Sequence, residues 1–238
     1  MSTVRPAPGG GKYVALSPVR VIGWFGRFGD RHQGISHTES TAVRVVVQAG
    51  DGSLAVADVP FAPLLTGDGG RLDWRPGEPP LRRPGLAVDD LVAHLLVPRR
   101  IGLLLVRLGG HSVGIAEAGR VLASATDRKP VHGRNKAGGW SQQRFARRRE
   151  GQARAALRAA ADDTVRLLVP RLPELTAVVL GGDRRALDTL RADHRLADVF
   201  AMAEPRILDV PEPRRTVLDD AAVRACAVEI LVTETPTP

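Results

Sequence analysis

Apolar residues near the start of the chain recur with the 3.6-residue period of a helix. Ser17 and Pro18 stand immediately before this stretch, in the positions favoured by an N-cap residue and a first-turn proline. The pattern therefore predicts a helix that turns an apolar, mostly aromatic face toward a core, made of Val21, Trp24, Phe25 and Phe28.

The next stretches alternate between strand-like and turn-like composition. β-branched residues fill 41–48 and 53–59 on either side of a glycine-rich turn, which predicts a β-hairpin. Residues 66–85 hold too many glycines and prolines for a regular element, so we expect a long surface loop there. A helical period returns in residues 86–97.

From residue 98 onward the pattern is that of a sheet covered by helices. Residues 101–108 are almost continuously apolar, as in a central strand buried on both faces, and a meander continues through 111–118 and 120–126. A second apolar run at 177–180 leads into a helix at 183–191. The remaining elements are an edge strand and a C-terminal helix, expected at 206–210 and 216–232.

These elements predict the α/β or α+β class, with one sheet covered by helices. We expect three regions along the chain: a disordered N-terminus, an N-terminal α+β region and a larger second domain, at residues 1–11, 12–97 and 98–238.

The longest predicted helix spans residues 141–169, with Ser141 as its N-cap. One face is apolar and suited to packing on a sheet, with Phe145, Ala153, Ala156, Leu157, Ala160, Leu167 and Leu168. The opposite face carries a ridge of four arginines, Arg144, Arg147, Arg154 and Arg158. At a rise of about 1.5 Å per residue this ridge is about 21 Å long.

The charge of the chain is concentrated in the same region. The 238 residues include 34 Lys and Arg against 26 Asp and Glu, a formal net charge of +8. Residues 128–158 hold ten of the basic residues and one acid, whereas the rest of the chain holds 24 basic and 25 acidic residues. A general bias toward arginine would not remove acids from one window, so the segment indicates a polyanionic partner such as nucleic acid.

Composition excludes several other classes of protein. A single cysteine, Cys226, rules out internal disulfides and multi-cysteine zinc sites, and the histidines form no ligand pattern. No apolar stretch reaches the roughly 18–20 residues of a membrane span, and the N-terminus lacks the apolar core of a signal peptide. We therefore expect a cytoplasmic, monomeric protein without metal, cofactor or membrane contact, and with His32 and His37 at its surface.

The loop before the long helix reads HGRNKAGGWSQQ from His132 to Gln143. Gly138 and Gly139 allow the backbone to approach a ligand closely, and the following helix start adds N–H groups and a positive dipole end. Gln142 and Gln143 are poor acids and poor nucleophiles, but their side-chain oxygens can orient a water molecule.

Two other kinds of chemistry have weaker signatures. Ser141 and His132 could pair as nucleophile and base, although no third residue completes a triad. The turn at residues 180–184 could bind a nucleotide, but it lacks the Gly-Lys-Ser/Thr of a P-loop, and Asp183 suits an N-cap better.

Residues 138–149, GGWSQQRFARRR, resemble the GGQ segment of eukaryotic and archaeal class I peptide-release factors, where a GGQS loop leads into an R-F-A-R-x-R helix. The upstream His132-Gly133-Arg134 is similar to the H-G-R of those proteins. Trp140, however, stands in the place of their catalytic glutamine, and residues 135–137 are added before the glycines. With its glutamine displaced in this way, the segment resembles the actinobacterial-type branch of the Vms-like release factor (VLRF) family. The G-x-x-Q arrangement of that branch fits residues 139–142.

The resemblance covers residues 98–238 and implies a ribonuclease H-like mixed sheet covered by helices, without nuclease chemistry. Consistent with this, residues 101–108 carry no carboxylate, whereas a metal-dependent nuclease of that fold needs acidic ligands on its central strands.

The resemblance also implies a peptidyl-tRNA hydrolase of the release-factor type, acting on stalled large ribosomal subunits in ribosome rescue or quality control. Its partners would be peptidyl-tRNA and large-subunit rRNA. Gln142 would orient the attacking water, with Gln143 as its rival one residue away, and Gly138 and Gly139 would let the loop tip enter the site. RNA contacts would come from Trp140 and from Lys129, Arg134, Lys136, Arg144, Arg147, Arg148, Arg154 and Arg158.

The main alternative is a non-catalytic factor that binds rRNA, tRNA or the ribosome through the same basic helix. In that case Trp140 would stack on a base, and ribosome binding would occur without peptide release.

Overall fold

The computed structural model describes residues 3–107, 109–128 and 140–235. At Thr3, Arg128 and residues 140–149 the description covers the backbone alone. The chain folds as two compact units, which consist of residues 3–97 with 226–235 and of residues 98–225.

A seven-stranded antiparallel sheet forms the first unit. Its strands are β1 (Thr3–Pro6), β2 (Lys12–Leu16), β3 (Ile35–Ser40), β4 (Arg44–Ala49), β5 (Leu54–Asp58), β6 (Leu81–Pro84) and β12 (Val228–Thr233). They lie in the order β1-β2-β12-β5-β4-β3-β6, so the last strand of the chain pairs between β2 and β5. The hairpin expected on either side of residues 50–52 is present as β4 and β5.

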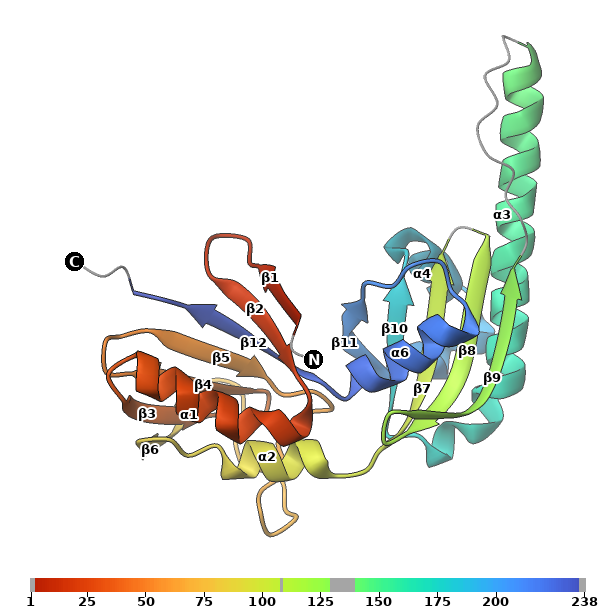
Figure 1. Ribbon diagram of the computed structural model, residues 1–238. Helices are drawn as coiled ribbons and strands as arrows, with labels where there is room; N and C mark the ends of the chain where they lie inside the picture. Colours follow the sequence, from red (N-terminus) through yellow and green to blue (C-terminus); the bar gives the residue numbers. More distant parts are fainter. Residues whose placement is uncertain (1–2, 108, 129–139, 236–238) are drawn as a thin grey trace. The chain divides into compact units, whose positions relative to one another are not determined.

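Two helices, α1 (Val21–Arg31) and α2 (Asp89–Leu96), pack against this sheet (Figure 1). Val21, Phe25 and Phe28 of α1 are fully buried, which confirms the apolar face predicted from their spacing. The turn at the start of α1 is a short 3₁₀ helix, η1 (Pro18–Arg20), and the Ser17 side chain makes no capping hydrogen bond there.

Three segments of the first unit differ from the sequence prediction. Residues 3–6, expected to be disordered, pair with β2, and the expected loop at 66–85 contains the exposed edge strand β6. An edge strand tolerates the proline at its end because that residue need not donate to a neighbour. The predicted C-terminal helix ends at residue 225, and the sequence that follows forms β12.

The predicted surface position of two histidines is also wrong. His37 is buried beside Glu39 and Arg82, and His32 is half-buried against Asp51. Both histidines are therefore structural parts of the first unit.

A mixed five-stranded sheet forms the second unit. Its strands are β7 (Arg100–Arg107), β8 (Gly110–Glu117), β9 (Arg120–Arg128), β10 (Ala177–Gly182) and β11 (Ala203–Leu208). The first three make an antiparallel meander, and β10 and β11 run parallel to β7, in the order β11-β10-β7-β8-β9. This order and these directions are those of the ribonuclease H-like sheet implied by the family resemblance.

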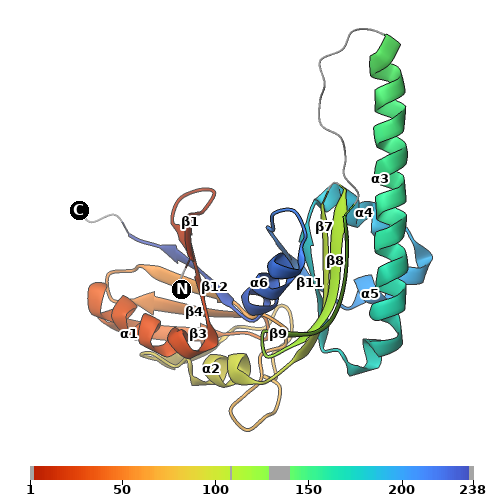
Figure 2. The same ribbon diagram turned by 45° about the vertical axis from the view of Figure 1, so that its right-hand side comes forward.

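Helices cover both faces of this sheet, as Figure 2 shows nearly edge-on. On one face lie α3 (Trp140–Leu167), α4 (Arg184–Arg191) and α5 (Ala197–Ala201), joined by the 3₁₀ helices η2 (Val169–Glu174) and η3 (His194–Leu196). On the other face lies α6 (Arg215–Ala225), whose Leu218 packs directly over Gly114 of β8.

The end of β10 is fixed by two glycines and an aspartate. A Cβ atom on Gly181 would meet the Leu105 side chain, and Gly182 has a φ of +100°, where a Cβ atom would collide with the carbonyl oxygen of Val106. Asp183 then caps α4, because its Oδ1 accepts the N–H groups of Arg185 and Ala186 at 2.8 and 3.3 Å. The expected N-cap is confirmed, and this turn is explained by strand and helix packing.

Candidate functional site

The long helix predicted over 141–169 is present as α3, 28 residues from Trp140 to Leu167. Its start lies one residue earlier than expected, so Ser141 is inside the first turn and is not the N-cap. Trp140, Gln142 and Gln143 therefore share the first turn, where the backbone N–H groups have no acceptor within the helix.

The predicted site residues fall into three groups. Lys129, Arg134, Lys136, Gly138 and Gly139 lie outside the described residues. Six residues belong to the backbone-described start of α3, namely Trp140, Gln142, Gln143, Arg144, Arg147 and Arg148. Two have described side chains, Arg154 and Arg158, and both are exposed.

Among the α3 residues whose side chains the structure describes, 150–167, the C-terminal part packs against the sheet. The buried positions begin at Ala156 and continue with Ala160, Ala161, Thr164 and Leu167. Glu150, Gly151 and Arg154, two to six residues before Ala156, are exposed. At about 1.5 Å per residue, the stretch before Ala156 reaches about 24 Å, and Figures 1 and 2 show it extending past the strand ends of the second unit.

The arginines at the boundary of this extension are open to solvent. Arg154 has Glu150 as an ion-pair partner at 3.7 Å, with both side chains about 70% exposed. Such a pair contributes little, because water and salt screen it. Arg158 has no ion pair among the described residues, so both cations are available to a partner.

A buried hydrogen bond ties the packed half of α3 to the sheet. His111 of β8 is 2% exposed, and its Nε2 lies 2.9 Å from Oδ2 of Asp163. Arg166 donates to the other oxygen of Asp163 at 2.7 Å. Burial alone would raise the pKa of Asp163, but the hydrogen bonds from Arg166 and His111 outweigh it and lower that pKa. Asp163 is thus an ionised acceptor for two donors on two elements.

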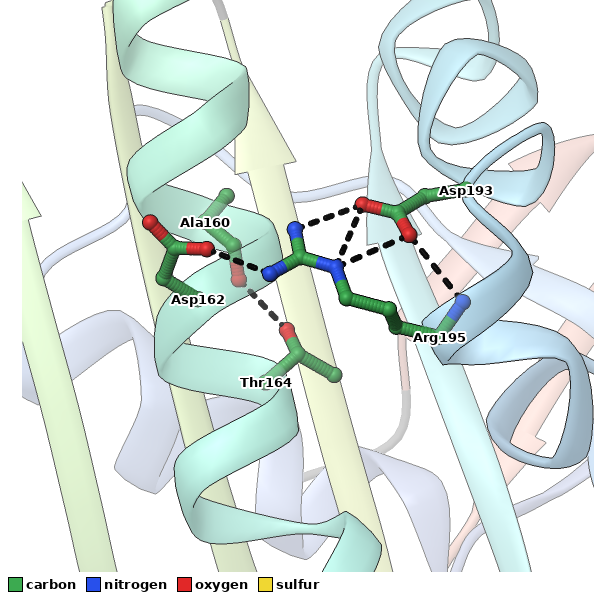
Figure 3. A network of polar contacts seen from close by, with 5 residues as sticks. All are labelled: Ala160, Asp162, Thr164, Asp193 and Arg195. Atoms are coloured by element: carbon green, nitrogen blue, oxygen red, sulfur yellow. Dashed lines mark hydrogen bonds and ion pairs between the residues drawn. The ribbon is translucent and has the colours of Figure 1, made fainter.

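A second anchor, drawn in Figure 3, joins α3 to η3. Arg195 donates to Asp162 of α3 at 2.8 Å and to both carboxylate oxygens of Asp193 at 2.7–3.2 Å. Hydrogen bonds from the Arg195 side chain lower the pKa of Asp193 to about 2. Thr164, buried beside this network, donates to the carbonyl oxygen of Ala160 at 2.6 Å. The sequence does not predict these anchors, because His111 and Asp163, like Asp162 and Arg195, lie far apart along the chain.

The described residues contain neither a cluster of three or more potential metal ligands nor a helix long and apolar enough to cross a membrane.

The family model for the Actinobacteria/chloroflexi VLRF1 release factors, acVLRF1, matches residues 99–231. The chain belongs to this family. The match spans the second unit and most of β12, and it confirms the resemblance inferred from the residues around Gly139 and Gln142. Membership of the acVLRF1 family supports a ribosome-associated role in release or rescue. No curated protein sequence matches the chain.

Solved structures give more distant similarities. The archaeal translation termination factor aRF1 matches with a TM-score of 0.40 and 16% identity over 75% of this chain and 48% of that one. An archaeal protein matches with a TM-score of 0.36 and 16% identity over 75% of this chain and 51% of that one. A third match is Dom34 of S. cerevisiae, a translation termination-like factor in RNA quality control that interacts with Hbs1. It has a TM-score of 0.27 and 9% identity over 94% of this chain and 69% of that one. The chain spans about half the length of the two archaeal proteins.

Proposed function

We propose that this acVLRF1 chain hydrolyses the ester bond between a nascent peptide and the 3′ end of its tRNA on stalled large ribosomal subunits. The observation that carries the proposal is the match to a release-factor family across the loop and α3. The reach of α3 beyond the sheet supports it, because the reacting ester lies inside a narrow RNA-walled site. The factor works where ribosomes are, in the cytoplasm, and requires no metal or cofactor.

The chemical step needs positioning more than acid–base strength. A water oxygen attacks the ester carbonyl carbon, the tRNA 3′ oxygen leaves with a proton, and the peptide gains a carboxyl group. Gln142 accepts a hydrogen bond from this water and aims it, while Gly138 and Gly139 let the loop approach the ester. An N–H group in the first turn of α3 stabilises the developing oxyanion.

Gln143 is the rival for the catalytic role, because one residue of register separates the two amides. Consecutive residues of a helix point about 100° apart, so only one of the two can face the ester in a given pose. The peptide-release rates of the two single alanine variants and of the double variant therefore show which glutamine orients the water.

The basic residues of the loop and of α3 hold the RNA partners. Lys129, Arg134, Lys136, Arg144, Arg147, Arg148, Arg154 and Arg158 contact rRNA or tRNA phosphates, and Trp140 stacks on a base. The exposure of Arg154 and Arg158 supports this part of the proposal.

The deciding experiment is single-turnover release of peptide from peptidyl-tRNA on isolated large subunits. Gln142→Ala should lower the release rate at least about 100-fold, as loss of one positioning contact does, with subunit affinity unchanged. Gln143→Ala makes the same change at the rival amide and should leave the release rate near that of the unaltered protein, whereas the reverse pattern would assign the catalytic role to Gln143. Full activity of the Gln142/Gln143 double alanine variant would refute the glutamine mechanism.

A non-catalytic ribosome-binding factor is the second candidate, and Trp140 favours it. Trp140 directly follows two glycines, where class I release factors have their catalytic glutamine. Tight subunit binding by the unaltered protein without any peptide release would establish this function instead.

A further inference from the structure

Two adjacent cavities lie between α3 and α4 in the second unit, and together we call them the α3–α4 groove. The cavities, of about 290 and 330 Å³, share Leu157 of α3 and Thr189 of α4 in their linings. The first cavity begins at Val106 and Arg107, where β7 ends, and the second continues toward η3. The groove therefore starts at the carboxyl end of the central strands, the edge at which open α/β sheets bind ligands.

Small and apolar side chains form the floor of this groove. Ala153, Ala156 and Leu157 come from α3, and Ala186 comes from α4. Such a floor accepts a flat apolar group, and a cavity of this size lies near the lower limit of small-ligand sites. A single nucleobase presents flat faces that can lie against such a surface, while its polar edges remain free to form hydrogen bonds.

Arginines surround the floor and remain available to a ligand. Arg107 and Arg185 belong to the first cavity, and Arg154 and Arg158 belong to the second. All four are exposed, and within the described part of the chain Arg107, Arg158 and Arg185 have no ion-pair partner.

The carboxylates of the groove are already engaged by protein groups. Asp183 accepts the two backbone N–H groups that it caps, while Asp162 and Asp193 are both bonded to Arg195. The free charge of the groove is therefore positive. A metal-dependent nuclease would need free carboxylates at this edge, so the groove is built for an anion.

We propose that the α3–α4 groove binds a single-stranded RNA segment, with phosphates held by the arginines and one unstacked base in the apolar cavity. The inference rests on the proposed function to the extent that a ribosomal partner supplies the RNA. Arginine binds phosphate oxygens through two parallel N–H groups, and apolar surfaces receive bases that are not stacked in a duplex. An acidic peptide would match the charge and leave the apolar floor unused.

The test measures binding of the full-length protein to a short labelled oligouridine and to isolated large subunits across a salt series. Arg107→Gln/Arg185→Gln should weaken oligouridine binding about tenfold and flatten the log–log salt slope by about 1.4, since each single-strand phosphate contact contributes about 0.7. Thr189→Trp fills the groove without changing charge and should also weaken binding. Circular dichroism establishes that each variant is folded.

The matched control is Arg120→Gln/Arg171→Gln, which removes the same charge at the opposite edge of the sheet. This is the end of the sheet at which β7 begins. Arg100 there pairs with Glu117, three residues before Arg120, and with Glu174, which lies in η2 together with Arg171. This variant should bind like the unaltered protein. Equal oligouridine affinity of the groove and control variants would overturn the inference. Weaker binding to labelled polyglutamate with unchanged RNA affinity would also overturn it, in favour of an acidic protein partner.

The two proposals fail separately. If Arg107→Gln/Arg185→Gln leaves the affinity for RNA and for large subunits intact, the groove does not bind RNA, regardless of the release rate of Gln142→Ala. The proposed hydrolysis falls if the Gln142/Gln143 double variant releases peptide normally, whatever the groove binds.

Discussion

The Nε2 atom of His111 lies 2.9 Å from Oδ2 of Asp163, and this contact joins the start of β8 to α3. Asp163 directly precedes the fully buried Thr164, within the packed part of the helix. The contact therefore fixes the base from which the basic, loop-proximal half of α3 extends.

Replacing His111 by alanine should lower the free energy of unfolding by about 1–3 kcal/mol, because Asp163 loses a partner and a buried side chain is removed. Urea denaturation measures the change. His194→Ala, at an exposed histidine of η3, is the control and should change stability by less than about 0.5 kcal/mol. Equal stability of the two variants would mean that the His111 contact does not hold α3.

Acid should weaken the Asp193–Arg195 anchor. The pKa of Asp193 is about 2 in the folded protein against an ordinary value of 3.8. A lowered folded pKa contributes stability that is complete above 3.8 and is lost as the pH falls from 3.8 toward 2. Asp193→Asn should therefore reduce the slope of unfolding free energy against pH in that window, measured by urea denaturation at each pH. An unchanged slope would contradict the ion pair.

Removing the charges of Arg154 and Arg158 should weaken binding to large subunits and spare the chemical step. The double glutamine variant should have a salt slope less steep by about 1.4–1.8, for two phosphate contacts, and a normal release rate at saturating protein. Filter binding in a salt series and single-turnover release measure the two effects. A fall in the saturated release rate with unchanged affinity would show that these arginines act in the reaction.

The elements of the second unit could be predicted from the sequence because each has a strong local signal. The apolar run at 101–108 and the helical period of α3 depend on nearest neighbours in the chain. The anchors and the groove could not be predicted, because His111 and Asp163, or Arg107 and Arg185, meet only after the sheet has formed.

The helix predicted over 216–232 is wrong beyond residue 225, where the chain forms β12. In this strand the buried Val228, Ile230 and Val232 alternate with less buried neighbours. That two-residue period, together with β-branched composition, is the signal of a half-buried strand.

A chain that ends at Ala225 should lose the fold of the first unit. It lacks β12, which pairs with both β2 and β5 and contributes three almost completely buried side chains, each worth about 1.5–3 kcal/mol. Limited proteolysis should cut residues 3–97 and spare residues 98–225, which have their own core. A control chain that ends at Thr235 keeps the strand and should resist. Equal resistance of both chains would contradict the pairing.

Two glycines of the second unit should respond to alanine in opposite directions. Gly182 has a φ of +100°, and a Cβ atom there would collide with the carbonyl oxygen of Val106, so Gly182→Ala should lower the free energy of unfolding by about 2 kcal/mol or more. Gly151 lies in the exposed part of α3 with open space around it, so Gly151→Ala should raise that free energy by up to about 1 kcal/mol. Urea denaturation of both variants tests the pair. Destabilisation by Gly151→Ala would show that this part of α3 is not a continuous exposed helix.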